Sequence, residues 1–177
     1  ENYAPVDLSG VKTYELASRP SKVTVEDFAE PVAPDDSLTD FLGKLPGILA
    51  VESLREIARQ IRRARRLEKP IVWGIGGHVV KTGLAPVLID LLRRGYVSAI
   101  AANGSVLVHD AEIALVGFTS EDVDASLVQG DFGAARETGE ILNQAAKSGA
   151  RARIGLGEAM GRELLALNPR NAELSIL

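Results

Sequence analysis

Two histidines are the side chains in this sequence that are best suited to catalysis or metal binding, and each follows a short apolar run. His78 comes soon after the run Ile71–Ile75, and His109 follows the run Ser98–Ala102. An imidazole exchanges protons near neutral pH and is a common metal ligand. Because the chain contains only these two histidines and they occupy corresponding positions, we expect them to share one site.

The two apolar runs predict neighbouring strands of a parallel sheet. Pro70 and glycines bound the first run, and the segment between the runs has helical apolar spacing and ends at Arg93-Arg94-Gly95. The order strand, helix, strand implies a right-handed crossover. We therefore predict an α/β fold with a Rossmann-like parallel sheet flanked by helices. Ligands of such sheets bind at the carboxyl ends of the strands.

Residues 74–82, which follow the first strand, predict a glycine-rich binding loop. Proline is tolerated in the first turn of a helix, so Pro86 places the next helix start near Thr82 or Gly83. This leaves about seven to nine residues between strand and helix, where roughly two to six are usual. Such a loop suits a phosphate or carboxylate. A tight turn without a ligand is the alternative, because the spacing matches neither G-x-G-x-x-G nor a Walker loop.

Residues 103–112, which follow the second strand, predict a second loop. Asn103-Gly104 favours a sharp turn, and Asp110 suits the cap of a helix expected near 110–117. The two loops define the candidate site. Its expected catalytic residues are His109, Asp110 and Lys81, and its expected cofactor-binding residues are Gly76, Gly77, His78, Asn103, Gly104 and Ser105.

Over about residues 70–120 these loops resemble deoxyhypusine synthase. The stretch from Gly74 to Leu84 is similar to the family's glycine, aromatic, Thr-Ser-Asn and Ser-Gly-Leu segment, and the stretch from Ala99 to Asp110 is similar to its Ala-Gly-Gly turn with acidic residues. The resemblance implies a divergent, bacterial transferase that binds NAD, forms a homo-oligomer, here a tetramer, and acts on a small polar, polyamine-like substrate. Gly-Gly-His replaces Thr-Ser-Asn, and the family's catalytic lysine has no counterpart here.

Two other functions remain open alongside an enzyme that depends on NAD or another nucleotide. A non-catalytic ligand-binding domain would use the same cleft. A metal-assisted hydrolase would use His78, His109 and Asp110, although no pair of histidines has the i, i+4 spacing of helical ligands.

The composition limits the domain organisation. Four of the eight prolines lie in residues 1–36, which predicts an extended N-terminal arm, and residues 37–177 are expected to form the Rossmann-like domain. Asp35-Asp36-Ser37 offers N-cap chemistry for a short helix. Two strands cannot bury both faces of a parallel sheet. The chain is therefore expected to be a fragment, or to lack C-terminal strands.

Charge and hydropathy exclude several partners. A net charge of −4 argues against binding a nucleic-acid backbone, and the arginine-rich segment from Arg55 to Lys69 is interpreted as a solvated helix face. No apolar run is long enough for a bilayer, no signal peptide is recognisable, and cysteine is absent. These features favour a cytoplasmic protein that binds a small molecule and neither nucleic acid nor membrane.

Overall fold

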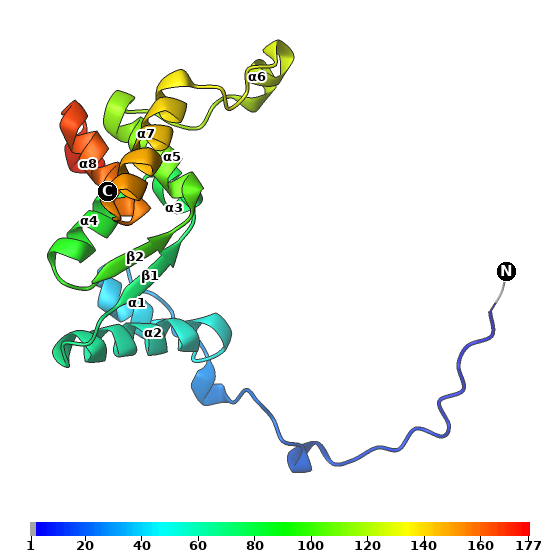
Figure 1. The fold of residues 1–177 in the computed structure, drawn as a ribbon. Helices are drawn as coiled ribbons and strands as arrows, with labels where there is room; N and C mark the ends of the chain where they lie inside the picture. Colours follow the sequence, from blue (N-terminus) through cyan, green and yellow to red (C-terminus); the bar gives the residue numbers. More distant parts are fainter. Residues whose placement is uncertain (1–2) are drawn as a thin grey trace. The chain divides into compact units, whose positions relative to one another are not determined.

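The computed structural model describes residues 3–177, with only the backbone of Gln129, and divides the chain into two compact units, Glu1–Arg59 and Gln60–Leu177. The expected division into an arm at 1–36 and a domain at 37–177 stays a prediction. The helices and strands (Figure 1) are α1 Leu38–Lys44, α2 Leu49–Arg66, β1 Val72–Ile75, α3 Gly77–Lys81, α4 Ala85–Arg93, β2 Ala99–Ala102, α5 Gly104–Val116, α6 Val123–Gln129, α7 Arg136–Ala152 and α8 Leu156–Leu167.

In the first unit, residues 3–36 contain short 3₁₀ turns at Leu16–Ser18 and Val25–Asp27, and neither α-helix nor strand (Figure 1). Almost every side chain in this stretch is exposed. Within residues 3–177, none of the helices combines the length and the apolar character that crossing a lipid bilayer requires.

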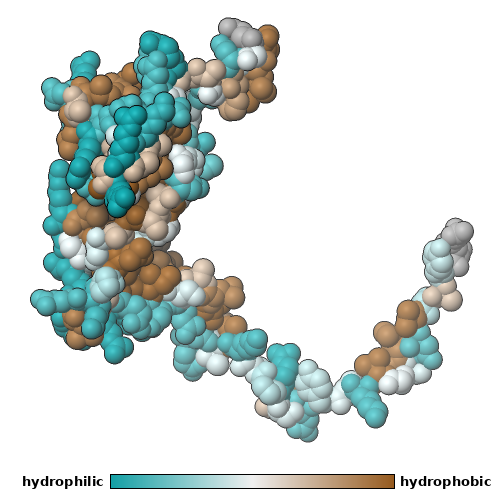
Figure 2. Space-filling view, viewed as in Figure 1, coloured by the Kyte–Doolittle hydropathy of each residue, from teal (hydrophilic) through white to brown (hydrophobic). Residues whose placement is uncertain are grey.

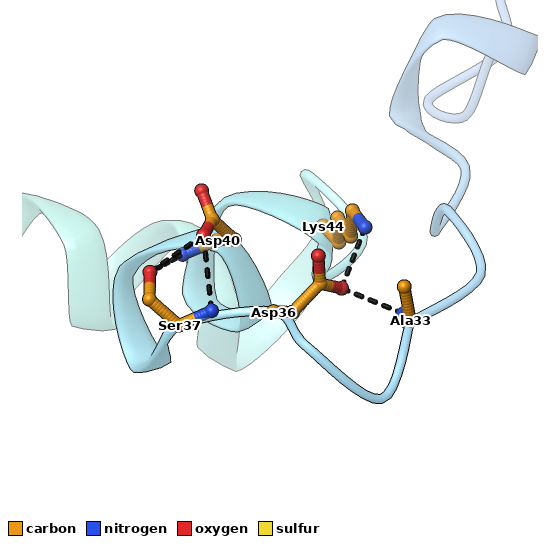
Figure 3. A network of polar contacts seen from close by, with 5 residues as sticks. All are labelled: Ala33, Asp36, Ser37, Asp40 and Lys44. Carbon is orange, nitrogen blue, oxygen red and sulfur yellow. Dashed lines mark hydrogen bonds and ion pairs between the residues drawn. The ribbon is translucent and has the colours of Figure 1, made fainter.

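The start of α1 confirms the predicted cap (Figure 3). The Ser37 hydroxyl accepts from the backbone N–H of Asp40 at 3.2 Å, and the Asp40 carboxylate accepts in return from the Ser37 hydroxyl at 2.6 Å. The hydrogen bonds that the carboxylate accepts from the Ser37 hydroxyl and from the Ser37 backbone N–H lower the pKa of Asp40. Asp36 accepts from the Ala33 N–H at 2.7 Å and pairs with Lys44 at 2.6 Å, so both ends of α1 are fixed.

The arginine-rich helix α2 is more than a solvated face. Within the first unit, the Arg55 guanidinium donates to the carbonyl oxygens of Leu42, Gly43 and Leu45, each at 2.8 Å, and so satisfies the last carbonyls of α1. Within the second unit, Arg65 lies 4.3 Å from the centre of the Tyr96 ring and donates to the Tyr96 hydroxyl at 3.1 Å. The spacing of the arginines gives no indication of these partners.

The predicted sheet is confirmed as two parallel strands. β1 and β2 pair in register from Val72 opposite Ala99 to Ile75 opposite Ala102. Val72 is 61% exposed, whereas Trp73 and Ile75 are half-buried, so one face of the sheet is covered better than the other. The exposed face agrees with the expectation that two strands cannot bury both faces of a parallel sheet.

Most of the buried core lies between α5, α7 and α8. Half of the buried side chains in this cluster are alanines, which lets the helix axes approach closely. Its buried members are Leu107, Ala111, Ala114, Ile141, Ala145, Ala159, Met160 and Leu164. The helix α6 lies outside it. Leu127 and Val128 on α6 are exposed, and Figure 2 shows apolar surface on this helix at the top of the view.

Glycine at position 149 determines how closely α7 and α8 pack. A Cβ atom there would lie 2.9 Å from the Cβ of Ala159, whereas one at Gly139, on the same helix, would meet nothing within 4 Å. We expect Gly149→Ala to lower the free energy of unfolding by about 1–3 kcal/mol through overpacking. The control Gly139→Ala should raise it by up to about 1 kcal/mol. Urea unfolding measures both, and equal stability of the two variants would contradict this packing.

Candidate functional site

The two strands end side by side, and each is followed by a helix after a single residue. Gly76 is the N-cap of α3, and Asn103 is the N-cap of α5. Because Ile75 pairs with Ala102, both helix starts lie at the same edge of the sheet, which we call the strand edge. Neither cap side chain accepts a hydrogen bond from a backbone N–H of its helix. The N–H of Gly77 is used by Ser105, whereas the N–H groups of Gly104 and Ser105 at the start of α5 are available to an anion.

The predicted long loops are wrong at both places. α3 begins at Gly77 and α5 at Gly104, so His78, His109 and Asp110 are helical residues. Val80 is fully buried, and this burial stabilises a helical turn that the glycine content of the segment does not suggest. Pro86 does lie in the first turn of α4, as predicted. The extra residues before it form α3 instead of a loop.

Gly77 brings α3 into close contact with α5. A Cβ atom at this position would lie 2.7 Å from the Ser105 Oγ and 2.8 Å from the Cδ2 of His109, so only glycine fits. The backbone N–H of Gly77 donates to the Ser105 hydroxyl at 3.2 Å, and that hydroxyl donates to the Asn103 side-chain oxygen at 2.7 Å. The structure thus brings together four of the predicted site residues.

His109 is held from its other side by a chain of polar side chains. Its Nδ1 lies 2.7 Å from the Thr119 Oγ1, and Thr119 donates to one carboxylate oxygen of Glu112. The second carboxylate oxygen accepts from the Thr138 hydroxyl at 3.0 Å. The i, i+3 spacing of His109 and Glu112 signals a shared helix face. Thr119 and Thr138 come from a loop and from α7, and nothing local in the sequence marks them.

Beyond this polar chain lies a cavity of about 890 Å³ between α5, the 118–121 segment, α7 and α8. Thr119, Thr138 and Glu112 line it, together with the carboxylates of Glu121 and Glu163. Its walls include apolar residues of α5 and α7. The polar chain therefore joins the strand edge to a second hollow that sequence reasoning missed.

Asp110 does not face the strand edge. It is fully buried and accepts from the Ser175 hydroxyl at 2.5 Å, the Ile176 N–H at 3.0 Å and the Leu177 N–H at 3.4 Å. Burial raises the pKa of Asp110, and these hydrogen bonds oppose that rise. Its observed contacts anchor residues 175–177.

His78 and Lys81 are both exposed on α3. Lys81 ends this five-residue helix, where its charge suits the negative end of the helix dipole. Within residues 3–177, no group of three or more metal-ligating side chains could hold a metal ion. With Asp110 turned to the C-terminal segment, the metal-assisted hydrolase loses its expected ligand set.

Comparison with known proteins identifies the kind of domain. Residues 55–152 match the family model described as "Arginine dihydrolase ArgZ-like, C-terminal, Rossmann fold". A curated relative, the ornithine cyclodeaminase of Methanothermobacter thermautotrophicus, is 34% identical over 74 residues, which are 42% of this chain and 18% of the relative. The matched segment thus spans less than a fifth of that relative. No solved structure matches the chain significantly.

These matches correct the family suggested by the sequence. The resemblance to deoxyhypusine synthase is wrong, and so is the function inferred from it, because both matches point to a different group of Rossmann domains. The glycine-containing strand-to-helix turn that carried the resemblance is common to many nucleotide-binding α/β folds. The coarser prediction of a Rossmann-like α/β fold is confirmed.

The buried carboxyl of Asp110 predicts a specific dependence of stability on pH. Its folded-state pKa lies above the ordinary value of 3.8. Its stabilising contribution is therefore complete below pH 3.8 and is lost as the pH rises through the folded-state pKa. The variant Asp110→Asn has no carboxyl group to ionise at this position, so it should not show this loss of stability with rising pH. It should also destabilise the fold by about 1–3 kcal/mol, because the donors Ser175 and Leu177 lose an acceptor.

The measurement is the free energy of unfolding across acidic pH for wild type and Asp110→Asn. The advantage of wild type should shrink as the pH rises. Asp124→Asn, at an exposed carboxylate on α6, controls for the loss of a charge. A wild-type advantage that grows with pH would contradict the assignment.

Proposed function

Because this chain belongs to the ArgZ-like family of C-terminal Rossmann domains, we propose that it is the NAD-binding part of an enzyme that acts on ornithine. The observation that carries the proposal is the strand edge, where α3 and α5 begin side by side after parallel strands. The edge lies inside the matched segment 55–152. The ornithine cyclodeaminase relative supports the substrate class.

The residues of the strand edge fit a dinucleotide. A Cβ atom at Gly76 or Gly104 would meet nothing within 4 Å, so the space in front of both helix starts is open. The N–H groups of Gly104 and Ser105 and the positive end of the α5 dipole favour the pyrophosphate. Gly76, Gly77, Asn103, Gly104 and Ser105 would hold it, with the exposed His78 beside them.

The bound nicotinamide would supply reversible hydride transfer. The chain's own contribution would be to bind the pyrophosphate, to orient the cofactor across the two helix starts and to provide a proton-exchanging imidazole at His109. Closing ornithine into a ring with loss of ammonia, as the name of the relative states, requires proton transfers at amine nitrogens. An imidazole near the edge is suited to them.

A charge placed at the start of α5 tests the cofactor site. Gly104→Asp has room for its side chain, and an acidic residue in the first helical turn favours the helix, but the charge would repel the pyrophosphate. Gly157→Asp puts the same charge into the first turn of α8, again with open space around it. It is a matched control.

We expect NAD to stabilise wild type and Gly157→Asp alike, by about 2.7 kcal/mol at a concentration 100 times the Kd. Gly104→Asp should lose most of this stabilisation. Thermal unfolding with and without NAD measures the effect. No stabilisation of wild type at millimolar NAD, or equal stabilisation of the two variants, would contradict the proposal.

A further inference from the structure

His109 lies between the strand edge and the cavity that Glu112, Glu121 and Glu163 line. The Cδ2 atom of its ring faces Gly77 on α3, while its Nδ1 is bonded to Thr119, which lines the cavity. The ring is half-buried. Its orientation is thus fixed by one steric contact and one hydrogen bond on opposite sides.

The hydrogen bonds determine which ring nitrogen carries the proton of neutral His109. A carboxylate accepts and cannot donate, and a threonine hydroxyl has one proton to give. Thr119 gives that proton to Glu112, so its oxygen can only accept from the imidazole. The Nδ1 of His109 must therefore carry the hydrogen, and the Nε2 keeps a free electron pair.

The Nε2 atom is accessible. Among the described residues, the Nδ1 bond to Thr119 is the one side-chain hydrogen bond of His109, so its Nε2 has no partner. Every buried side-chain nitrogen or oxygen in the described part of the chain does have a partner. An unpartnered Nε2 therefore reaches solvent. Because Cδ2 is bonded to Nε2 and faces Gly77, this atom lies on the side of the ring that is turned toward α3.

We propose that Glu112, acting through Thr119, holds His109 in the Nδ1–H form and so makes its Nε2 the proton acceptor for an ammonium group of the substrate bound at the strand edge. The step breaks an N–H bond of the substrate's ammonium group and forms an Nε2–H bond, and the electron pair of the broken bond stays on the substrate nitrogen, which becomes a neutral amine. This inference rests on the proposed function for its substrate. Glu112 and Thr119 are positioning residues, and the negative charge of Glu112 balances the imidazolium that forms.

Thr138 completes the arrangement from α7. It donates to the Glu112 oxygen that Thr119 does not use, so the carboxylate is held from two elements while only one of its oxygens acts on the histidine. The two hydroxyls therefore have different roles, although they bind the same side chain. This difference provides a matched control.

Nitrogen-15 NMR of the imidazole rings tests the assignment directly, because protonated and unprotonated ring nitrogens give separate resonances. The chain has two histidines, so His78→Ala identifies the His109 signals. At about pH 8.5, where an ordinary imidazole is neutral, the Nδ1 of His109 should be the protonated nitrogen. Thr119→Val should shift the ring toward the Nε2–H form, whereas Thr119→Ser and Thr138→Val should keep the Nδ1–H form.

A kinetic measurement on the full-length enzyme tests the role in proton transfer. With ornithine and NAD, Thr119→Val should lower kcat by roughly 10²-fold, the lower range of general-base effects, with little change in KM, and Thr119→Ser should restore it. An Nε2–H form in wild type, or full kcat in Thr119→Val, would overturn the proposal. If instead NAD does not stabilise wild type while the NMR result is as expected, the proposed cofactor fails and the assigned tautomer stands.

Discussion

The contact between Gly77 and α5 is the constraint on which the rest of the site depends. No side chain larger than hydrogen fits between the α3 backbone and the atoms of Ser105 and His109. The contact fixes the distance between two helices that follow neighbouring strands, and it therefore fixes the strand edge itself. It also restricts rotation of the His109 ring, because the Cδ2 edge of the ring contacts Gly77. A larger residue would separate the two helix starts and release the imidazole.

A second buried interaction holds α5 from the opposite direction. Among the described residues no cation pairs with the buried Asp110, which accepts three hydrogen bonds from residues 175–177. A buried carboxyl is costly unless donors satisfy it, and here the donors come from the end of the chain. On α8, Gly161 would place a Cβ atom 2.7 Å from the Leu177 carbonyl oxygen, so this segment fits closely between two helices. The position of α5 thus depends on long-range contacts at both of its faces.

The sequence was sufficient for the two strands and for their parallel order, because apolar runs bounded by proline and glycine are local signals. It was insufficient for the connections. Counting glycines favoured long loops, whereas burial of Val80 makes the segment helical. The contacts of Asp110 span 65 to 67 residues, and Thr138 is 26 residues from Glu112. No local pattern predicts partners at such distances.

The pattern of α5 explains why its chemical role is difficult to recognise in sequence. Ser105, His109 and Glu112 are four and three residues apart, which places them on one helix face. The buried residues Leu107, Ala111 and Ala114 occupy another. An ordinary surface helix has a polar face in water and an apolar face in the core, but the polar face of α5 is turned to α3, Thr119 and Thr138. A helix enclosed on several sides can keep its polar residues only if each has a partner or a ligand. The Nε2 of His109, which reaches solvent, is the position on this face that we propose for the substrate's ammonium group.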